Sequence, residues 1–236
     1  MPTDASRQRN LTMRPGAGIT SPSVYRAGPL MSFPEKAYGQ AGEYLTAYRQ
    51  TLLEAWQSVD PQAANRATDM LATAIKADRV VFACGNGGSA AIANHLTCDC
   101  LKGIQTDTPL RPRVISLAAT IELITAIAND IAYAEVFVYQ LRSLAQPGDV
   151  LITISASGNS ENIVRAIGWA RDHRIGSIAL TGFDGGRSAG LADVNLHVRA
   201  ANYGIVEDVH QSLMHVMAQY LRQQAMPPEL IAGRRF

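Results

Sequence analysis

Apolar residues follow two different periods along this chain, and the change between them comes near residue 78. From residue 41 to 59 they recur every three or four positions, which is the period of one face of an amphipathic helix. Residues 63–77 repeat this pattern after Pro61, a residue suited to a first helical turn. The first part of the domain is therefore predicted to be two helices.

Five short apolar runs follow, and segments of helical composition separate most of them. Continuous apolar runs that alternate with helices are typical of strands buried on both faces of a parallel sheet. We therefore predict an α/β fold, a three-layer αβα sandwich, closed by an amphipathic helix over residues 205–224. The runs are RVVFA (79–83), RVISLA (113–118), DVLITIS (149–155), GSIALTG (176–182) and DVNLHVR (193–199).

The two ends of the chain lie outside this pattern. Residues 1–35 are rich in Arg, Ser, Pro and Gly and lack the apolar centre of a secretory signal, so we expect a disordered N-terminal extension. Residues 226–236 are expected to form a loose C-terminal tail. The folded domain, with its two leading helices, is predicted to span residues 36–225.

Composition excludes several classes of partner. The chain has 236 residues, 47% of them hydrophobic, and a formal net charge of +1. This balance gives no electrostatic reason to expect nucleic acid or an anionic membrane, and no run approaches the roughly 18 apolar residues of a transmembrane helix. An odd number of cysteines without paired spacing, Cys84, Cys98 and Cys100, indicates a reducing compartment, the cytoplasm.

Two of the predicted strand ends carry similar polar loops. The first run leads into CGNGGS (84–89) and the third into SASGNS (155–160), each before a predicted helix. Hydroxyls and free backbone N–H groups at a helix N-terminus bind anions, most often phosphate. Ser89 and Ser160 could alternatively be simple helix N-caps, but three serines within the second loop favour a ligand. Neither loop has the GxGxxG or GK[ST] pattern of nucleotide-binding loops.

Five segments carry a more specific pattern, namely CGNGGSAAIANH, LITAIANDIAYAEVF, GDVLITISASGNSENIVRAI, ALTGFDGG and VEDVHQSLMH. In order, from about residue 37 to 223, they resemble the phosphoheptose isomerase (sedoheptulose 7-phosphate isomerase) branch of the sugar isomerase, or SIS, domain superfamily. The resemblance implies a five-stranded parallel sheet between helices and a homotetramer with active sites at subunit interfaces. It also implies interconversion of sedoheptulose 7-phosphate and D-glycero-D-manno-heptose 7-phosphate.

The resemblance assigns residues to this small-molecule sugar phosphate. The phosphate ligands that it implies agree with the two polar loops, and they are Ser89, Ser155, Ser157 and Ser160. The residues that it places along the sugar are Asn86, Gly87, Asn129 and Asp130.

Aldose–ketose isomerisation needs a base for a carbon-bound proton and a proton donor for oxygen, and a carboxylate beside a histidine can divide these tasks. The resemblance places a carboxylate four residues after a histidine, here Asp99 after His95, so that both share one helix face. It places a second histidine at His215. We assign the acid–base chemistry to Asp99 and His215, with Glu207 as a third participant.

Two of these positions depart from the family's well-studied enzymes, which carry Glu at position 99 and Gln at position 207. Asp99 keeps a carboxylate whose reach is about 1.5 Å shorter, and catalysis is sensitive to such changes in geometry. Some relatives bind zinc at the positions of His95, Asp99, Glu207 and His215, a donor set acceptable to Zn²⁺. We keep one zinc ion per subunit open as a cofactor and expect no organic cofactor.

Two other functions stay open at this point. The residues at positions 99 and 207 leave room for an isomerase of another phosphosugar. One relative in the superfamily is a non-catalytic regulator that binds a replication initiator protein, although this chain keeps the carboxylate and histidine that such a regulator has lost. The last predicted helix also carries His210, whose angular offset from Glu207 and His215 predicts a role in packing or at an interface.

Overall fold

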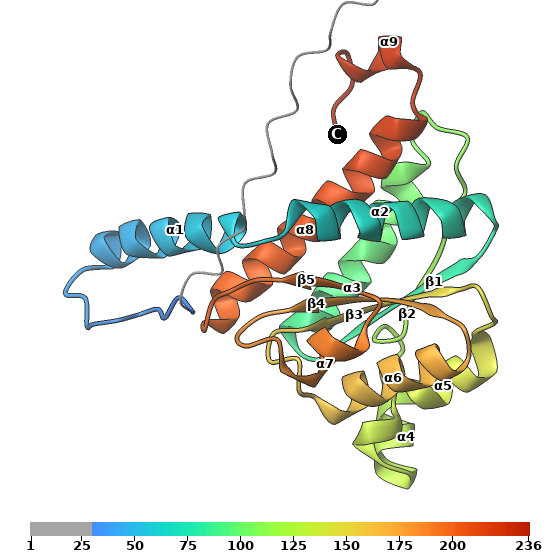
Figure 1. The fold of residues 1–236 in the computed structure, drawn as a ribbon, viewed down its shortest axis with the longest axis horizontal. Coiled ribbons are helices and arrows are strands. Elements are labelled where there is room, and N and C mark those ends of the chain that lie inside the picture. The colour runs from blue at the N-terminus through green and yellow to red at the C-terminus, as the bar shows by residue number, and fades with distance from the viewer. Residues whose placement is uncertain (1–29) are drawn as a thin grey trace, which may run out of the picture.

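A computed structural model describes residues 30–236 and confirms an α/β sandwich around one parallel sheet (Figure 1). All neighbouring strands pair in parallel, in the order β2-β1-β3-β4-β5. Each strand overlaps one of the five predicted apolar runs. The strands are β1 (Val80–Gly85), β2 (Arg113–Ser116), β3 (Val150–Ser155), β4 (Gly176–Thr181) and β5 (Val194–His197).

Helices cover both faces of the sheet: α2, α3 and α8 lie on one face, and α5 and α6 on the other (Figure 1). None of the helices within residues 30–236 is long and apolar enough to span a membrane. The helical segments are α1 (Ala41–Gln57), α2 (Pro61–Lys76), α3 (Gly88–Cys98), η1 (Asp99–Ile104), α4 (Ile121–Asp130), η2 (Tyr133–Glu135), α5 (Val138–Leu144), α6 (Glu161–Asp172), α7 (Gly186–Leu191), α8 (Tyr203–Ala225) and α9 (Pro228–Ile231).

Burial on both faces explains why the strands are continuously apolar. Along β1, Val81 and Ala83 pack into the cluster formed with α2, α3 and α8. Val80, Phe82 and Cys84 alternate with them and pack into the cluster formed with α5 and α6. Successive side chains of a strand point to opposite faces, so a sheet covered on both sides needs apolar residues at every position.

Two helices precede the sheet, as predicted. Asp60 accepts two backbone N–H groups at the start of α2, and Pro61 occupies its first turn. By contrast, α1 is largely exposed and buries Ala55 alone among its residues. Tyr48 of α1 donates a hydrogen bond to Asp208 of α8 over 2.6 Å. This contact joins the first helix to the last large one.

Both ends of the described chain pack against the domain. Met31 forms a parallel bridge with Ala200, and Phe33 is buried against the rings of Tyr44 and Tyr48. The disordered extension predicted for residues 1–35 falls mainly on residues 1–29, which lie outside the described residues. The segment predicted as a tail contains α9 and returns to the end of α8, where Arg222 donates to the carbonyl of residue 235.

The strand order contains a topological switch point between β1 and β3. From β1 the chain crosses to β2 on one side, and it then returns to β3 on the other side of β1. In open parallel sheets, ligands bind beyond the carboxyl ends of the strands that flank such a point. The predicted anion-binding loops, residues 84–89 and 155–160, follow these two strands.

Candidate active site

The loop after β1 turns where side-chain bulk is excluded. Gly87 has a φ of +55°, a left-handed value that favours glycine, and α3 begins at the next residue. A side chain at Gly88 would collide with the carboxylate of Glu207, which projects from α8. Burial raises the pKa of Glu207, and the nearby Asp208 raises it further. Glu207 therefore lies beside the glycine loop in an environment that raises its pKa above the ordinary value.

The serines of the two loops are not engaged as helix caps. Gly87 is the N-cap of α3, and Ser89 is buried within the first turn. Ser160 is the N-cap of α6, yet its hydroxyl makes no capping hydrogen bond within the described part of the chain. Ser155 and Ser157 accept backbone N–H groups at 3.2 and 3.3 Å, so their O–H protons stay available to a ligand.

The loop after β3 is braced by the glycine-rich segment 182–186. Gly158 has a φ of +64°, and its Cα lies so close to the Gly185 carbonyl that a side chain does not fit. Ser188 of α7 donates both its backbone N–H and its hydroxyl to the Gly158 carbonyl, at 2.9 and 2.8 Å. These contacts hold the serine loop in shape without a ligand.

Asn86 links the two loops. Asn86 Nδ2 donates to Asn162 Oδ1 at 3.0 Å, and Asn162 Nδ2 donates back to Asn86 Oδ1 at 2.9 Å. Asn162 is buried near the start of α6. Because β1 and β3 are neighbours in the sheet, a residue after one strand reaches the helix that follows the other.

Asn129 and Asp130 end α4 and contact each other, with Asn129 Nδ2 donating to Asp130 Oδ1 at 2.8 Å. Tyr133, three residues further on, connects this segment to the first loop, since its hydroxyl donates to Asn86 Oδ1 at 2.8 Å. Sequence reasoning missed Tyr133. The quoted motif LITAIANDIAYAEVF contains it, but no period or spacing marks it out from its neighbours.

Asp99 lies between two histidines. Its Oδ1 is 3.3 Å from His95 Nε2, and its Oδ2 is 3.0 Å from His215 Nδ1. His95 comes from α3 and His215 from α8, two helices in contact with each other. Asp99 also begins the π-helical segment η1, a rare conformation that is frequent at functional sites. The structure thus brings the predicted acid–base pair within contact distance.

His95, Asp99 and His215 could hold a metal ion, because one donor atom from each lies within 4.8 Å of the others. Asp99 Oδ2 is buried and has no hydrogen-bond partner in the described part of the chain, despite its proximity to His215. An unsatisfied carboxylate oxygen between two imidazoles fits a cation, and this donor set suits zinc. Glu207 is not part of this group among the described residues, since it lies against Gly88.

The second ring nitrogen of His215 also has a neighbour. Gln211, one turn earlier on α8, places its Nε2 3.0 Å from His215 Nε2. This contact fixes the position of the imidazole ring, while the ring nitrogen that carries the proton depends on the tautomer. Gln211 is a further residue that sequence reasoning did not identify.

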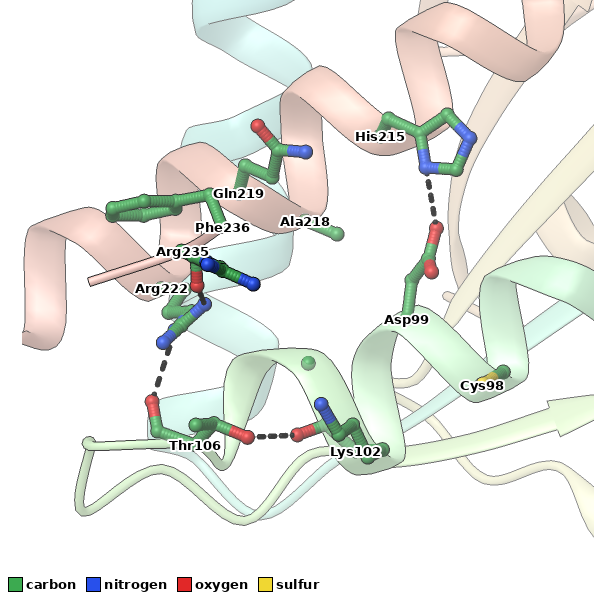
Figure 2. Close-up of a pocket in the computed structure, with 11 residues that line it drawn as sticks. Cys98, Asp99, Lys102, Thr106, His215, Ala218, Gln219, Arg222, Arg235 and Phe236 are labelled. Atoms are coloured by element: carbon green, nitrogen blue, oxygen red, sulfur yellow. Dashed lines mark hydrogen bonds and ion pairs between the residues drawn. The ribbon is translucent and has the colours of Figure 1, made fainter.

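A pocket of about 510 Å³ opens beside Asp99 and His215 (Figure 2). Helices η1 and α8 form its walls, together with Arg235 and Phe236 from the C-terminal segment. Arg222 holds this segment by donating to the Arg235 carbonyl at 3.0 Å and by lying over the Phe236 ring. The segment predicted as a tail therefore lines the pocket. The other lining residues are Cys98, Lys102, Gly103, Thr106, Ala218 and Gln219.

Comparison with known proteins gives consistent matches. A family model described as SIS domain matches residues 43–182. The phosphoheptose isomerase of Colwellia psychrerythraea is 39% identical over 181 residues, which cover 75% of this chain and 91% of that protein. The phosphoheptose isomerase of Shewanella denitrificans is 36% identical over 183 residues, covering 76% of this chain and 92% of that protein.

Solved structures agree with these sequence matches. The structure of the phosphoheptose isomerase from Neisseria gonorrhoeae superposes with a TM-score of 0.71 and 31% identity, covering 77% of this chain and 98% of that one. A phosphoheptose isomerase from Francisella tularensis also gives a TM-score of 0.71, with 29% identity and coverage of 77% and 96%. The similarity therefore extends over nearly the whole length of each of these proteins.

Proposed function

The chain belongs to the SIS domain family and, within it, to the phosphoheptose isomerases, and from this membership we propose that it interconverts sedoheptulose 7-phosphate and D-glycero-D-manno-heptose 7-phosphate. One observation carries the choice of acid–base chemistry. Asp99 lies between two histidines, with its Oδ2 3.0 Å from His215 Nδ1, at the C-cap of the helix that begins at the glycine loop.

The phosphate is proposed to bind at the switch point, where α3 and α6 begin. Helix N-termini and hydroxyls favour a phosphate there. Along a helix with a rise of about 1.5 Å per residue, the ten positions from Ser89 to Asp99 span roughly 15 Å, which suits a long sugar phosphate. The proposed phosphate ligands are Ser89, Ser155, Ser157 and Ser160, and the proposed sugar contacts are Asn86, Gly87, Asn129 and Asp130.

Isomerisation of the ketose moves one proton between carbons and one between oxygens. Asp99 takes a proton from C1, which leaves an enediolate, and returns it to C2. His215 donates a proton to O2 and takes the proton of the O1 hydroxyl, so that the carbonyl ends at C1. A carboxylate and an imidazole in contact can divide these steps. Glu207, whose carboxylate lies against Gly88 of the glycine loop, is proposed as a third participant in the acid–base chemistry.

We also propose, as an alternative to the acid–base role of Asp99 and His215, that His95, Asp99 and His215 hold one zinc ion per subunit, since a nitrogen or oxygen bound to zinc cannot also transfer a proton. The chemistry of the donor set and the unsatisfied Asp99 Oδ2 support this proposal. Bound there, zinc would polarise a carbonyl oxygen and stabilise negative charge on it. No organic cofactor is proposed.

The proposed setting is a homotetramer in the cytoplasm, with active sites at subunit interfaces and neither nucleic acid nor a membrane as partner. Exposed apolar side chains on α1, Leu45 at 66% and Leu53 at 53%, support an assembly. Cys84, Cys98 and Cys100 are free thiols, which supports a reducing compartment.

Proton NMR in D₂O tests the proposed reaction directly. Purified protein, with and without added Zn²⁺, is incubated with sedoheptulose 7-phosphate and, in parallel, with five- and six-carbon phosphosugars. We expect the heptose 7-phosphate with deuterium at C2, because a proton held by Asp99 exchanges with solvent before it returns. If no aldose forms from the heptulose in either arm, the proposal is wrong. Turnover of a shorter sugar alone would assign a different phosphosugar.

The same assay tests Asp99. Asp99→Asn should lower kcat/KM by about 10²- to 10⁴-fold, because the amide cannot accept the C1 proton. Asp69→Asn makes the same chemical change at an exposed position of α2 and should leave kcat/KM unchanged. Equal activity of the two variants would remove Asp99 from catalysis.

A further inference from the structure

Tyr133 lies at the start of η2 with 54% of its surface exposed, so packing does little to fix its ring. Its hydroxyl nevertheless reaches Asn86, 47 positions earlier in the chain, and donates to Asn86 Oδ1 at 2.8 Å. We infer that Tyr133 is a positioning residue of the sugar site. Its hydrogen bond holds the Asn129–Asp130 segment against Asn86 and determines which hydrogen-bond donor and acceptor are offered to one sugar hydroxyl. This inference rests on the proposed function.

The hydrogen bonds of Asn86 define what it can offer to a ligand. Its Oδ1 accepts from both Tyr133 and Asn162, which uses both lone pairs of the carbonyl. Its Nδ2 gives one hydrogen to Asn162 Oδ1 at 3.0 Å, and one N–H is left. Asn86 therefore faces the sugar as a donor alone.

Tyr133 supplies the complementary group. Its hydroxyl gives its proton to Asn86, so the lone pairs of the phenolic oxygen remain as an acceptor. The pair thus presents one donor and one acceptor on two hydrogen-bonded side chains. A sugar hydroxyl both donates and accepts hydrogen bonds, which is the chemistry that such a pair recognises.

The segment that carries Asn129 and Asp130 has few other attachments. Ile127 is the one residue of α4 that is fully buried, whereas Ile121 and Ile131 are exposed. Beyond Tyr133, Glu135 is held on α6 by Arg165, with 2.7 Å between Oε1 and Nη1. A segment with few buried contacts opens easily unless polar contacts hold it. The hydrogen bond from the Tyr133 hydroxyl to Asn86 holds this segment toward the sugar site.

Tyr133→Phe tests this role because it removes the hydroxyl and leaves the ring. Loss of one neutral hydrogen bond corresponds to a rise in KM for the heptose phosphate of about three- to tenfold. We expect kcat to change less than twofold, about the scatter of the assay, since Tyr133 takes no part in proton transfer. Tyr139→Phe is the matched control. Tyr139 is 44% exposed on α5, and its hydroxyl has no hydrogen bond within the described part of the chain.

A double-variant cycle tests whether Tyr133 acts through Asn86. In an Asn86→Ala background the acceptor is gone, so Tyr133→Phe should not raise KM further. An unchanged KM in the single variant, or an undiminished effect in the Asn86→Ala background, overturns the inference.

Amide hydrogen exchange gives a readout that does not depend on the substrate. In Tyr133→Phe, exchange over residues 129–133 should become faster than in the wild-type chain, while exchange in β1 and β3 stays unchanged. Unchanged exchange over residues 129–133 would show that the Tyr133 hydroxyl does not hold this segment, and would overturn the inference. If the wild-type chain converts no heptose phosphate, the proposed function fails, and hydrogen exchange still decides whether Tyr133 holds the segment.

Discussion

At the scale of single residues, His210 shows how the fold around the site constrains an ionisable group. It is fully buried on α8, with its Nε2 3.2 Å from the Thr181 carbonyl at the end of β4. Its Nδ1 is buried and has no hydrogen-bond partner among the described residues. Burial lowers the pKa of His210, the Thr181 hydrogen bond partly opposes this, and the nearby His197 adds to the lowering, so that the pKa falls from 6.5 to about 4.

This depressed pKa predicts a loss of stability in mild acid. Between pH 6.5 and pH 4 the unfolded chain binds a proton at His210 and the folded chain does not, so the stability present above pH 6.5 declines as the pH falls. From pH 7 to pH 5 the contribution is a loss of about 2 kcal/mol in the free energy of unfolding. Urea unfolding of the wild-type chain at the two pH values measures the total change.

Two variants isolate the part that belongs to His210. His210→Gln keeps an N–H for the Thr181 carbonyl and cannot titrate, so its unfolding free energy should depend less on pH. His173→Gln removes an exposed histidine that stacks on Trp169 and should keep the wild-type dependence. If His210→Gln shows the same pH dependence as the wild-type chain, another group is responsible.

At the scale of elements, strands were easier to predict than contacts between elements. A strand covered on both faces leaves a continuous apolar run, and β3 over Val150–Ser155 lies within the predicted run 149–155. The position of Glu207 against Gly88 has no such signal, because it depends on how α8 packs on α3. Family resemblance grouped both Asp99 and Glu207 with the two histidines, and within the described residues the structure brings Asp99 to them but not Glu207.

The packing of the C-terminal segment on α8 is a second contact between elements that the sequence does not signal. It predicts that two arginines contribute differently to the free energy of unfolding. Arg222 and Arg234 both pair with Asp107, at 3.2 and 3.1 Å. The Arg222 side chain is 8% exposed and also donates to the Thr106 and Arg235 carbonyls, whereas that of Arg234 is 47% exposed. Buried charged groups with several hydrogen bonds contribute far more than exposed pairs.

Arg222→Met should therefore lower the free energy of unfolding by about 2 kcal/mol or more and release the segment from the pocket. Arg234→Met should cost less than about 1 kcal/mol. Urea unfolding gives both values, and hydrogen exchange over residues 228–236 reports the release. Similar losses in the two variants would contradict the anchoring role of Arg222.

At the scale of the whole molecule, the strand order determines where the chemistry gathers. Composition and periodicity predicted a parallel sheet but not its order, since that depends on which face each crossover takes. The order places β1 beside β3, so that the loops of residues 84–89 and 155–160 become neighbours. Asn86 and Asn162 then meet across the switch point. The serine loops were recognisable singly in the sequence, whereas their pairing is a property of the fold.

The exposed face of α1 carries the last prediction, which concerns assembly. Figure 1 shows α1 extending away from the sheet, and Leu45 and Leu53 on it are exposed. Large apolar side chains on an exposed helix are typical of a subunit interface. Leu45→Glu combined with Leu53→Glu should convert the proposed tetramer into smaller species, because two carboxylates would be buried without partners. Light scattering measures the mass, and circular dichroism checks that the fold is kept.

Arg66→Glu is the control, since it lies exposed on a different helix, α2, and changes the net charge by the same amount as the two leucine substitutions together. We expect it to keep the wild-type mass, because a residue outside an apolar contact tolerates a charge. A wild-type chain that is monomeric at micromolar concentration would contradict the proposed tetramer. If the tetramer survives both leucine substitutions, the interface lies elsewhere and the exposed leucines of α1 take no part in assembly.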